Sequence, residues 1–262
     1  MVAVELPRRA LGQAVGLLVV PLVLLALWQL LAMLLGSFYL ATPAETFTAI
    51  VNGLRDGPLG QDLLVTLQEV ALGYAIAAVA GLWIGLLLGL NRFWAAAYEP
   101  IFLTIYSIPK VTLFPIFLFF FGLGVSSKIA FGAFHAVFPI ILFSLEATRT
   151  VPRPLQKLSR QLGLSPWATF RLIVLPWAAP SIVAGLRIGF SLAYLGVILG
   201  EMFASRAGSG YRLIQLAIAH NLPEMFAIIT VLVVIALVGN GLLLGWEHLL
   251  LRHRRQGSAR LF

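Results

Sequence analysis

The stretch that decides the fold is TRTVPRPLQKLSRQLGLSPWATFRLIVLPW, residues 148–177. It lies between two strongly apolar segments and carries basic residues but no acid. The basic residues are Arg149, Arg153, Lys157, Arg160 and Arg171. Gly163 suits the turn after a short helix, and Ser165 followed by Pro166 suits the start of the next helix. The stretch therefore predicts a basic helix–turn–helix that is offered to a partner, or that lies on anionic lipid headgroups.

The composition outside this stretch indicates a membrane protein. Of the 262 residues, 60% are hydrophobic and 11% are charged, whereas a soluble domain carries about 25% charged residues. Several apolar runs approach the roughly 20 residues that a helix needs to cross a bilayer. We therefore expect an all-α polytopic membrane protein, since the strands of a transmembrane barrel would be short and alternating.

The net charge and the cysteine count exclude several kinds of site. The net charge of +8 fits the basic cytoplasmic loops of a membrane protein better than nucleic-acid binding. The chain has no Cys, which rules out disulfides and thiolate metal sites. His248 and His253 are too loosely spaced to suggest a metal site, so none is expected.

The apolar runs predict six spans within a single transmembrane domain, residues 1–262. These spans lie near residues 14–36, 64–90, 98–122, 128–146, 176–200 and 225–250. Pro109 and Pro115 interrupt the third span, which should be bent or broken. The loop 147–175 connects the fourth span to the fifth. Residues 37–63 look like a turn-rich polar connection, and residues 201–224 like a short amphipathic one.

The distribution of Lys and Arg predicts the orientation. With both termini in the cytoplasm, the inner segments hold Arg8, Arg9, Arg92, Arg149, Arg153, Lys157, Arg160, Arg171, Arg252, Arg254, Arg255 and Arg260. The outer segments hold only Arg55, Lys128, Arg206 and Arg212. This excess favours cytoplasmic termini, and an even number of spans agrees with it. The basic residues of the C-terminal tail are expected to contact anionic lipid.

The loop 147–175 resembles the EAA loop of inner-membrane permeases of binding-protein-dependent ABC importers. That pattern runs Glu-Ala-Ala, three residues, Gly, nine residues, Ile, one residue, Leu-Pro. Four residues fall in step with it, namely Gly163, Ile173, Leu175 and Pro176. The three positions of Glu-Ala-Ala hold Lys157, Leu158 and Ser159 instead, so the acid of the pattern is replaced by a base.

Other segments are similar to the nitrate, sulfonate, taurine and bicarbonate branch of this family. These segments are TLQEVALGY (66–74), SIPKVTLFPIFLFFFGLG (107–124), SKI (127–129), FPI (138–140), GLRIGFSLAY (185–194) and GEM (200–202). The first of them departs from the branch, because Glu69 occupies a position where a basic residue is common. The resemblance covers roughly residues 64–250.

The resemblance implies the type I ABC importer permease fold and half of a translocation channel in the bacterial inner membrane. A second copy of the chain would complete the channel as a homodimer, and a periplasmic or lipid-anchored binding protein would deliver a small organic or inorganic anion. A cytoplasmic ATPase dimer would bind ATP and Mg²⁺ and dock on the EAA loop. The coupling residues would be Lys157, Leu158, Ser159, Arg160, Leu162, Gly163, Leu164 and Ser165.

The chain itself is not expected to be an enzyme or to hold a cofactor. It contains no Gly-Lys-Ser or Gly-Lys-Thr, and therefore no Walker A phosphate loop. A stand-alone secondary transporter or channel is the alternative, but it predicts intramembrane carboxylates or inverted repeats, which the sequence does not display. An intramembrane hydrolase would need Gly-x-Ser-x-Gly or His-Glu-x-x-His, and neither motif occurs.

Several polar residues at membrane depth are candidates for contact with the transported solute. Lys110 is foremost, because a charge in the bilayer costs at least roughly 2.5–3.5 kcal/mol unless it faces protein or water. The full set is Tyr106, Ser107, Lys110, Thr112, His135, Arg187, Ser191 and Tyr194. Each could instead have a structural role, and Lys110 could pair with Glu99 or Glu146. Glu201, near the outer end of the fifth span, could pair with Arg206 or Arg212, or contact the binding protein. Gly73, Ala77, Gly81, Gly85 and Gly89 form a small-residue stripe that predicts close helix packing.

Overall fold

The computed structural model describes residues 6–258, with side chains for residues 19–249 and 251. Every regular element in this part of the chain is helical, as the composition predicts. The charge count also uses Arg260 and the side chains of Arg8, Arg9, Arg252, Arg254 and Arg255, which lie outside the described residues.

The chain divides into two compact units, which are described one at a time. Unit 1 comprises residues 1–60 and 213–231. It contains α1 (Leu6–Leu35), α2 (Pro43–Arg55), the end of α10 (Ser209–Ile218) and the start of α11 (Leu222–Ser258). The indole of Trp28 in α1 donates a hydrogen bond of 2.9 Å to the carbonyl of Ala41, and its ring lies 6.0 Å from that of Phe226.

Helix α2 corrects the prediction that residues 37–63 form a polar, turn-rich connection. The side chain of Thr42 accepts a hydrogen bond from the backbone N–H of Glu45, and the Glu45 carboxylate accepts one from the backbone N–H of Thr42. Pro43 occupies the first turn, where its missing N–H costs nothing. This reciprocal capping box starts a helix of 13 residues.

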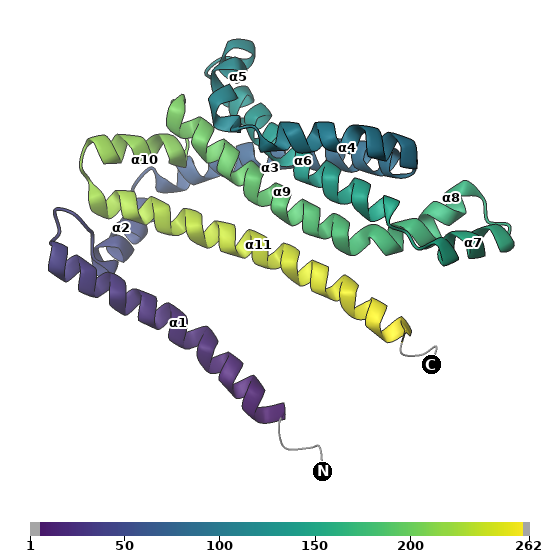
Figure 1. Cartoon of the computed structure of the whole chain (residues 1–262). Helices are drawn as coiled ribbons and strands as arrows, with labels where there is room; N and C mark the ends of the chain where they lie inside the picture. The colour runs from purple at the N-terminus through teal and green to yellow at the C-terminus, as the bar shows by residue number, and fades with distance from the viewer. Residues whose placement is uncertain (1–5, 259–262) are drawn as a thin grey trace. The chain divides into compact units, whose positions relative to one another are not determined.

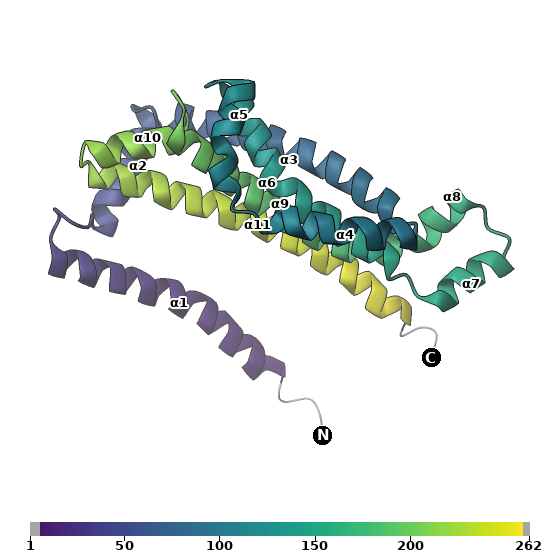
Figure 2. The ribbon, with the colours of Figure 1, turned by 45° about the horizontal axis from the view of Figure 1, so that its top comes forward.

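Unit 2 comprises residues 61–212 and 232–262. Its elements are α3 (Leu59–Gly89), α4 (Arg92–Ser107), the 3₁₀ turn η1 (Lys110–Leu113), α5 (Phe114–Phe121), α6 (Val125–Arg149), α7 (Arg153–Gln161), α8 (Pro166–Thr169), the π turn η2 (Phe170–Val174) and α9 (Leu175–Phe203), with parts of α10 and α11. Helices α6 and α9 lie side by side, and α7 and α8 project beyond their ends (Figures 1 and 2).

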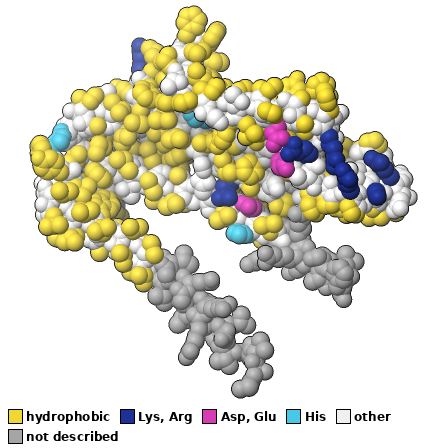
Figure 3. Space-filling view, viewed as in Figure 1, with side chains coloured by type: hydrophobic (Ala, Val, Ile, Leu, Met, Phe, Trp, Pro, Cys, Tyr) yellow, Lys and Arg dark blue, Asp and Glu magenta, His cyan; other side chains and the backbone are white. Residues whose placement is uncertain are grey.

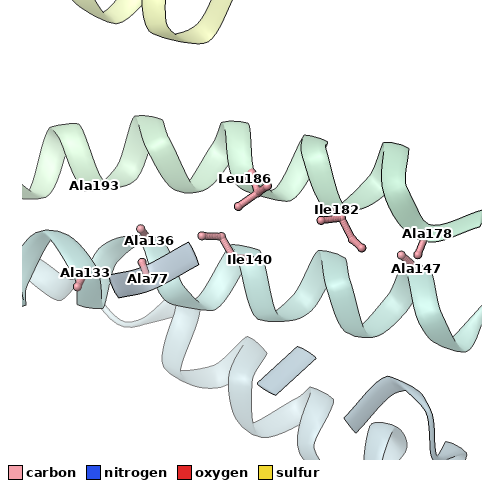
Figure 4. Close-up of a cluster of buried hydrophobic side chains, with 9 residues drawn as sticks. All are labelled: Ala77, Ala133, Ala136, Ile140, Ala147, Ala178, Ile182, Leu186 and Ala193. Carbon is pink, nitrogen blue, oxygen red and sulfur yellow. The ribbon is translucent and has the colours of Figure 1, made fainter. Parts of the chain in front are cut away.

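The core of unit 2 is built from small and branched residues. Alanines of α6 and α9 let the two helices approach closely, while Ile140, Ile182 and Leu186 fill the space between them (Figure 4). The glycine stripe of α3 packs against α6, as its spacing predicts. A Cβ on Gly81 would lie 2.7 Å from Ile140 Cγ2, and one on Gly85 would lie 2.6 Å from the carbonyl oxygen of Ile141. Only small residues permit this contact.

Among the described residues, four helices are long and apolar enough to cross a membrane. They are Leu59–Gly89, Val125–Arg149, Pro166–Phe203 and Leu222–Leu249. Arg92–Ser107 and Lys110–Phe121 qualify together as a fifth span that is bent by 83°. The break lies between Ser107 and Lys110, at Pro109, which confirms that the third predicted span is broken. The described side chains of α1 form a shorter apolar helix, Val19–Leu35.

The connection between the fourth and fifth spans is more helical than predicted. Helix α6 continues to Arg149, and a continuous helical run from Pro166 to Phe203 replaces the predicted start at residue 176. The π turn η2 allows this continuity, because it keeps the backbone helical between α8 and α9. Short non-helical segments flank α7, and the second predicted helix of the loop is continuous with the fifth span.

Candidate functional site

The predicted helix–turn–helix is present, and Gly163 makes its turn. The backbone N–H of Gly163 donates to the carbonyl of Arg160 at 3.1 Å, and that of Leu164 donates to the carbonyl of Ser159 at 3.0 Å. These two bonds form a Schellman motif, which requires a left-handed residue after the helix. Gly163 supplies it with a φ of +62°. The Ser165 hydroxyl then caps α8 by accepting from the Ala168 N–H at 3.2 Å.

Helix α7 presents two faces of different chemistry. Arg153, Lys157 and Arg160 recur at spacings of three and four, which places them on one face of the helix. Leu155 and Leu158 lie on the opposite face, and Leu162 continues that face into the turn. Both Leu158 and Leu162 are exposed, Leu162 to 64%. An exposed leucine face beside a charged face is typical of a helix that docks in a partner groove.

Most of the predicted coupling residues are accessible to a partner. Lys157, Arg160, Gly163 and Ser165 are exposed, and Leu164 is partly buried. Ser159 differs, because its side chain is buried and its hydroxyl donates to the Gln156 carbonyl at 2.9 Å. The Ser159 hydroxyl is therefore bonded within α7 itself and is not offered to a partner.

Four of the predicted pathway residues lie at the break between α4 and α5. Tyr106 and Ser107 end α4, and Lys110 and Thr112 belong to η1. Lys110 is only 9% exposed. Its ammonium group donates to the Tyr106 carbonyl at 2.7 Å and lies 4.5 Å from the centre of the Tyr106 ring. An ammonium group has three donors, so this single hydrogen bond leaves donors available for a solute.

His135 of α6 lies against the same break. Its Nδ1 is 3.0 Å from the Phe131 carbonyl oxygen, so Nδ1 carries the proton and donates. The ring of Phe138, one turn further along α6, lies 5.8 Å from the Lys110 ammonium group. The fold thus brings Tyr106 of α4, Lys110 of η1 and Phe138 of α6 together from three elements, with His135 about one turn from Phe138.

The other three pathway residues form a separate row between α9 and α11. Arg187 makes an ion pair of 3.3 Å with Glu247. Ser191 donates to the side-chain oxygen of Asn240 at 2.9 Å, and the Tyr194 hydroxyl donates to the Leu232 carbonyl at 2.8 Å. These polar groups hold α9 and α11 together at three successive levels. No group of three or more His, Cys, Asp or Glu side chains able to hold a metal occurs among the described residues.

A buried carboxylate network, which the sequence does not reveal, lies at the opposite end of unit 2 from α7. Glu201 at the end of α9 is fully buried. Its carboxylate accepts from the Thr66 hydroxyl at 2.8 Å and from the Gly210 N–H at 2.7 Å. The predicted pairing of Glu201 with Arg212 is wrong, because Arg212 binds Asp62 at 2.9 Å. No described contact joins Glu201 to Arg206.

Two more buried charges complete this network. Glu69 of α3 and Lys128 of α6 are each only 1% exposed, and both line the same small cavity. The Lys128 ammonium group donates to the carbonyls of Leu123 and Gly124, at 2.5 and 3.0 Å. The network therefore ties α3, α6 and α9 to the loop that precedes α6. The sequence signal that could have drawn attention to this network is Glu69, which occupies a position where related sequences commonly have a basic residue.

We expect Glu201→Ala to destabilise the protein strongly. The substitution removes the buried acceptor of the Gly210 N–H and of the Thr66 hydroxyl, and a buried donor left unsatisfied costs roughly 1–3 kcal/mol, to which the cavity left by the side chain adds. Thermal unfolding in detergent, followed by size exclusion, measures the effect. Glu224→Ala is the matched control, because Glu224 is exposed and should change stability little. Equal unfolding temperatures for the wild type and Glu201→Ala would contradict this account of the network.

Comparison with known proteins agrees with this geometry. Residues 77–256 match the family described as the inner membrane component of binding-protein-dependent transport systems. A nitrate import permease of Synechocystis is 33% identical over 226 residues, which cover 83% of this chain and 81% of that protein. A Bacillus subtilis permease whose name assigns it to aliphatic sulfonate transport is 27% identical over 249 residues, which cover 94% of this chain and 90% of that protein.

Two further similarities concern the solute and the fold. A riboflavin transport permease of Chloroflexus aurantiacus is 33% identical over 86% of this chain and 84% of that protein. A crystal structure of the MetNI methionine ABC transporter in inward-facing conformations contains a chain with the same fold, at a TM-score of 0.65 and 21% identity, covering 73% of this chain and 95% of that one. The family match extends over most of the chain and includes the α7–α8 turn. The protein belongs to the binding-protein-dependent ABC transport permeases, the multi-pass inner-membrane subunits that work with a separate ATPase and a binding protein.

Proposed function

We propose that two copies of this chain form the translocation pathway of an ATP-driven importer for a small anion. Each copy contributes six spans of one permease domain, with both termini in the cytoplasm: α1, α3, the bent pair α4–α5, α6, α9 and α11. A binding protein delivers the solute to the outer face. A cytoplasmic ATPase dimer binds ATP and Mg²⁺ and docks on α7. The observation that carries the proposal is the exposed leucine face of α7, held by the Gly163 turn.

The leucine face is suited to transmit force. Leu158 and Leu162 are exposed on a short helix that the Schellman turn and the Ser165 cap hold in one orientation. Helix α8 continues through η2 directly into α9 without a flexible linker. A displacement of α7 by the ATPase therefore reaches the fifth span through rigid helix. Helix α9 packs along α6, so the fourth span would move with it.

The broken third span supports the pairing of two copies. Helix α5 exposes Phe119 to 84%, and Phe120 and Phe121 are exposed beside it. Non-helical backbone within a membrane is tolerated where protein covers it or where it lines a water-filled cavity. A second copy packed on α5 would cover the aromatic side chains and leave the break at Lys110 facing the shared pathway.

The buried ammonium group of Lys110 supports an anionic solute. Its charge is held by a single hydrogen bond, to the Tyr106 carbonyl, and Phe138 lies beside it. The relatives fit this chemistry in part: nitrate and aliphatic sulfonates are anions, whereas the riboflavin permease takes a different solute by its name. Arg187, Ser191 and Tyr194 are bound to α11, and their part in the pathway stays a prediction.

Co-purification of the ATPase tests the proposed docking face. The double variant Leu158→Asp/Leu162→Asp should hold the cognate ATPase at least about a hundredfold more weakly, because each buried leucine contributes roughly 1.5–3 kcal/mol. Leu54→Asp is the matched control, since Leu54 is similarly exposed but lies on α2, on the predicted outer side. Undiminished recovery of the ATPase with the double variant would contradict the proposal.

A further inference from the structure

A basic hollow lies between α7 and the ends of the spans in unit 2. It has a volume of about 850 Å³. Its lining comes from the end of α3, the start of α4, the end of α6, α7, α8 and η2. The Lys and Arg side chains at this end of the molecule gather over α7 and α8 in the space-filling view (Figure 3). The hollow is formed by segments up to 85 residues apart, from Gly89 to Val174.

The charge of the hollow is not neutralised. Its basic side chains are Arg92, Arg149, Arg153, Lys157 and Arg160, and no acidic residue lines it. Arg149 is already bound to Glu99 at 2.6 Å and to Glu146 at 2.5 Å. The other four basic side chains make no ion pair with any described residue. The hollow therefore presents unpaired positive charge from two separate segments, the start of α4 and α7.

The remaining walls of the hollow are apolar in part, with Thr148, Gln156, Ser159 and Thr169 as polar side chains. Leu90, Val151, Leu164, Phe170 and Val174 line it beside the basic side chains. Helices α3 and α6 end at its rim, at Gly89 and Arg149, which places the hollow where two predicted spans leave the bilayer. A site of this kind offers cations to a headgroup and apolar surface to the glycerol and upper acyl carbons of a lipid.

We propose that this hollow binds the phosphate group of an anionic phospholipid from the cytoplasmic leaflet. Basic pockets beside transmembrane helices on the cytoplasmic side are suited to anionic headgroups. The ATPase is a poorer occupant, because the basic face of α7 turns toward the hollow while the leucine face is free for docking. Free phosphate would leave the apolar wall in contact with water. The inference rests on the proposed orientation of the chain and adds a lipid to its partners.

Lipid retention by the purified permease–ATPase complex tests the site. The complex is exchanged into nanodiscs of phosphatidylcholine with phosphatidylglycerol, then released and analysed by native mass spectrometry. Wild type should retain phosphatidylglycerol in preference to phosphatidylcholine. The double variant Arg92→Gln/Arg153→Gln should bind phosphatidylglycerol about thirtyfold more weakly. Each basic side chain near an anionic headgroup contributes about fivefold to the affinity, and the variant removes two of them. Arg171→Gln is the matched control, because this exposed arginine of the same segment does not line the hollow.

The outcomes separate the possible occupants. Loss of phosphatidylglycerol in the double variant alone supports the proposal. Equal loss in Arg171→Gln would overturn it, because general positive charge would then explain binding. Displacement of the lipid by millimolar inorganic phosphate would identify free phosphate as the ligand and overturn the lipid assignment. Loss of the ATPase with retained phosphatidylglycerol would assign the basic face to the ATPase. A failure of lipid binding with the ATPase still attached would leave the proposed function intact.

Discussion

Gly163→Val should reduce ATP-driven uptake to less than about a tenth of the wild-type rate. A left-handed backbone costs an L-residue about 1–2 kcal/mol, and a β-branched residue tolerates it worst. No atom lies within 4 Å of the position where a Cβ would be added to Gly163, so the cost is conformational and not a steric clash. The valine should open the Schellman turn and change the direction of α7. Uptake into proteoliposomes and ATP hydrolysis, measured on the same preparation, report the loss of coupling.

Gly163→Asn is the matched control for this experiment. Asparagine enters the left-handed region more readily than other non-glycine residues, so this variant should keep most of the wild-type uptake. Insertion of Gly163→Val into the membrane should be normal, because the turn lies outside the spans. Full coupled uptake by Gly163→Val would contradict the role of the turn. Equal losses in both variants would show that the backbone conformation at Gly163 is not what matters.

Lys110→Met should lower the maximal uptake rate at least about tenfold without impairing assembly. Methionine keeps an unbranched stem of similar length and removes only the charge. That removal should favour membrane insertion, since a buried charge costs roughly 2.5–3.5 kcal/mol on insertion scales. Loss of one charge-assisted hydrogen bond to an anionic solute is worth about 1.5–3 kcal/mol, which corresponds to a tenfold effect or more. Uptake is measured with saturating binding protein, loaded with the solute that co-purifies with it.

The Lys110 experiment has two internal controls. Lys110→Arg keeps the positive charge and should retain a larger share of the uptake rate than Lys110→Met. The amount of ATPase that co-purifies should be the same for the wild type and both variants, because Lys110 lies far along the chain from α7. An unchanged uptake rate for Lys110→Met would remove Lys110 from the pathway. Loss of the ATPase together with uptake would give Lys110 a structural role at the break between α4 and α5.

The parts of the fold that local rules govern could be predicted from the sequence. Pro109 marks the break of the third span, and Gly163, Ser165 and Pro166 mark the turn after α7, because each acts through its own backbone geometry. The capping box of α2 is equally local. Thr42 and Glu45 have the required spacing, but the prolines and glycines around them gave residues 37–63 the look of a polar connection.

The buried network could not be predicted, because it depends on contacts between distant segments. Thr66 and Ser209 are separated by 143 positions, yet their hydroxyls lie 3.0 Å apart beside Glu201. Position along the chain offered Arg206 and Arg212 as partners for Glu201. In the fold, Arg212 forms its ion pair with Asp62 instead. The basic hollow was hidden for the same reason, since Arg92 joins the cations of α7 only after α3 has brought it alongside.

Reconstitution with and without the ATPase tests the central claim most directly. The purified permease is incorporated into liposomes with its cognate binding protein and the solute recovered from that protein, and uptake is followed with ATP on the α7 side. The account predicts uptake only when both the ATPase and ATP are present, with no uptake above the empty-liposome rate by the permease alone. Solute uptake by the permease in the absence of any ATPase would contradict it.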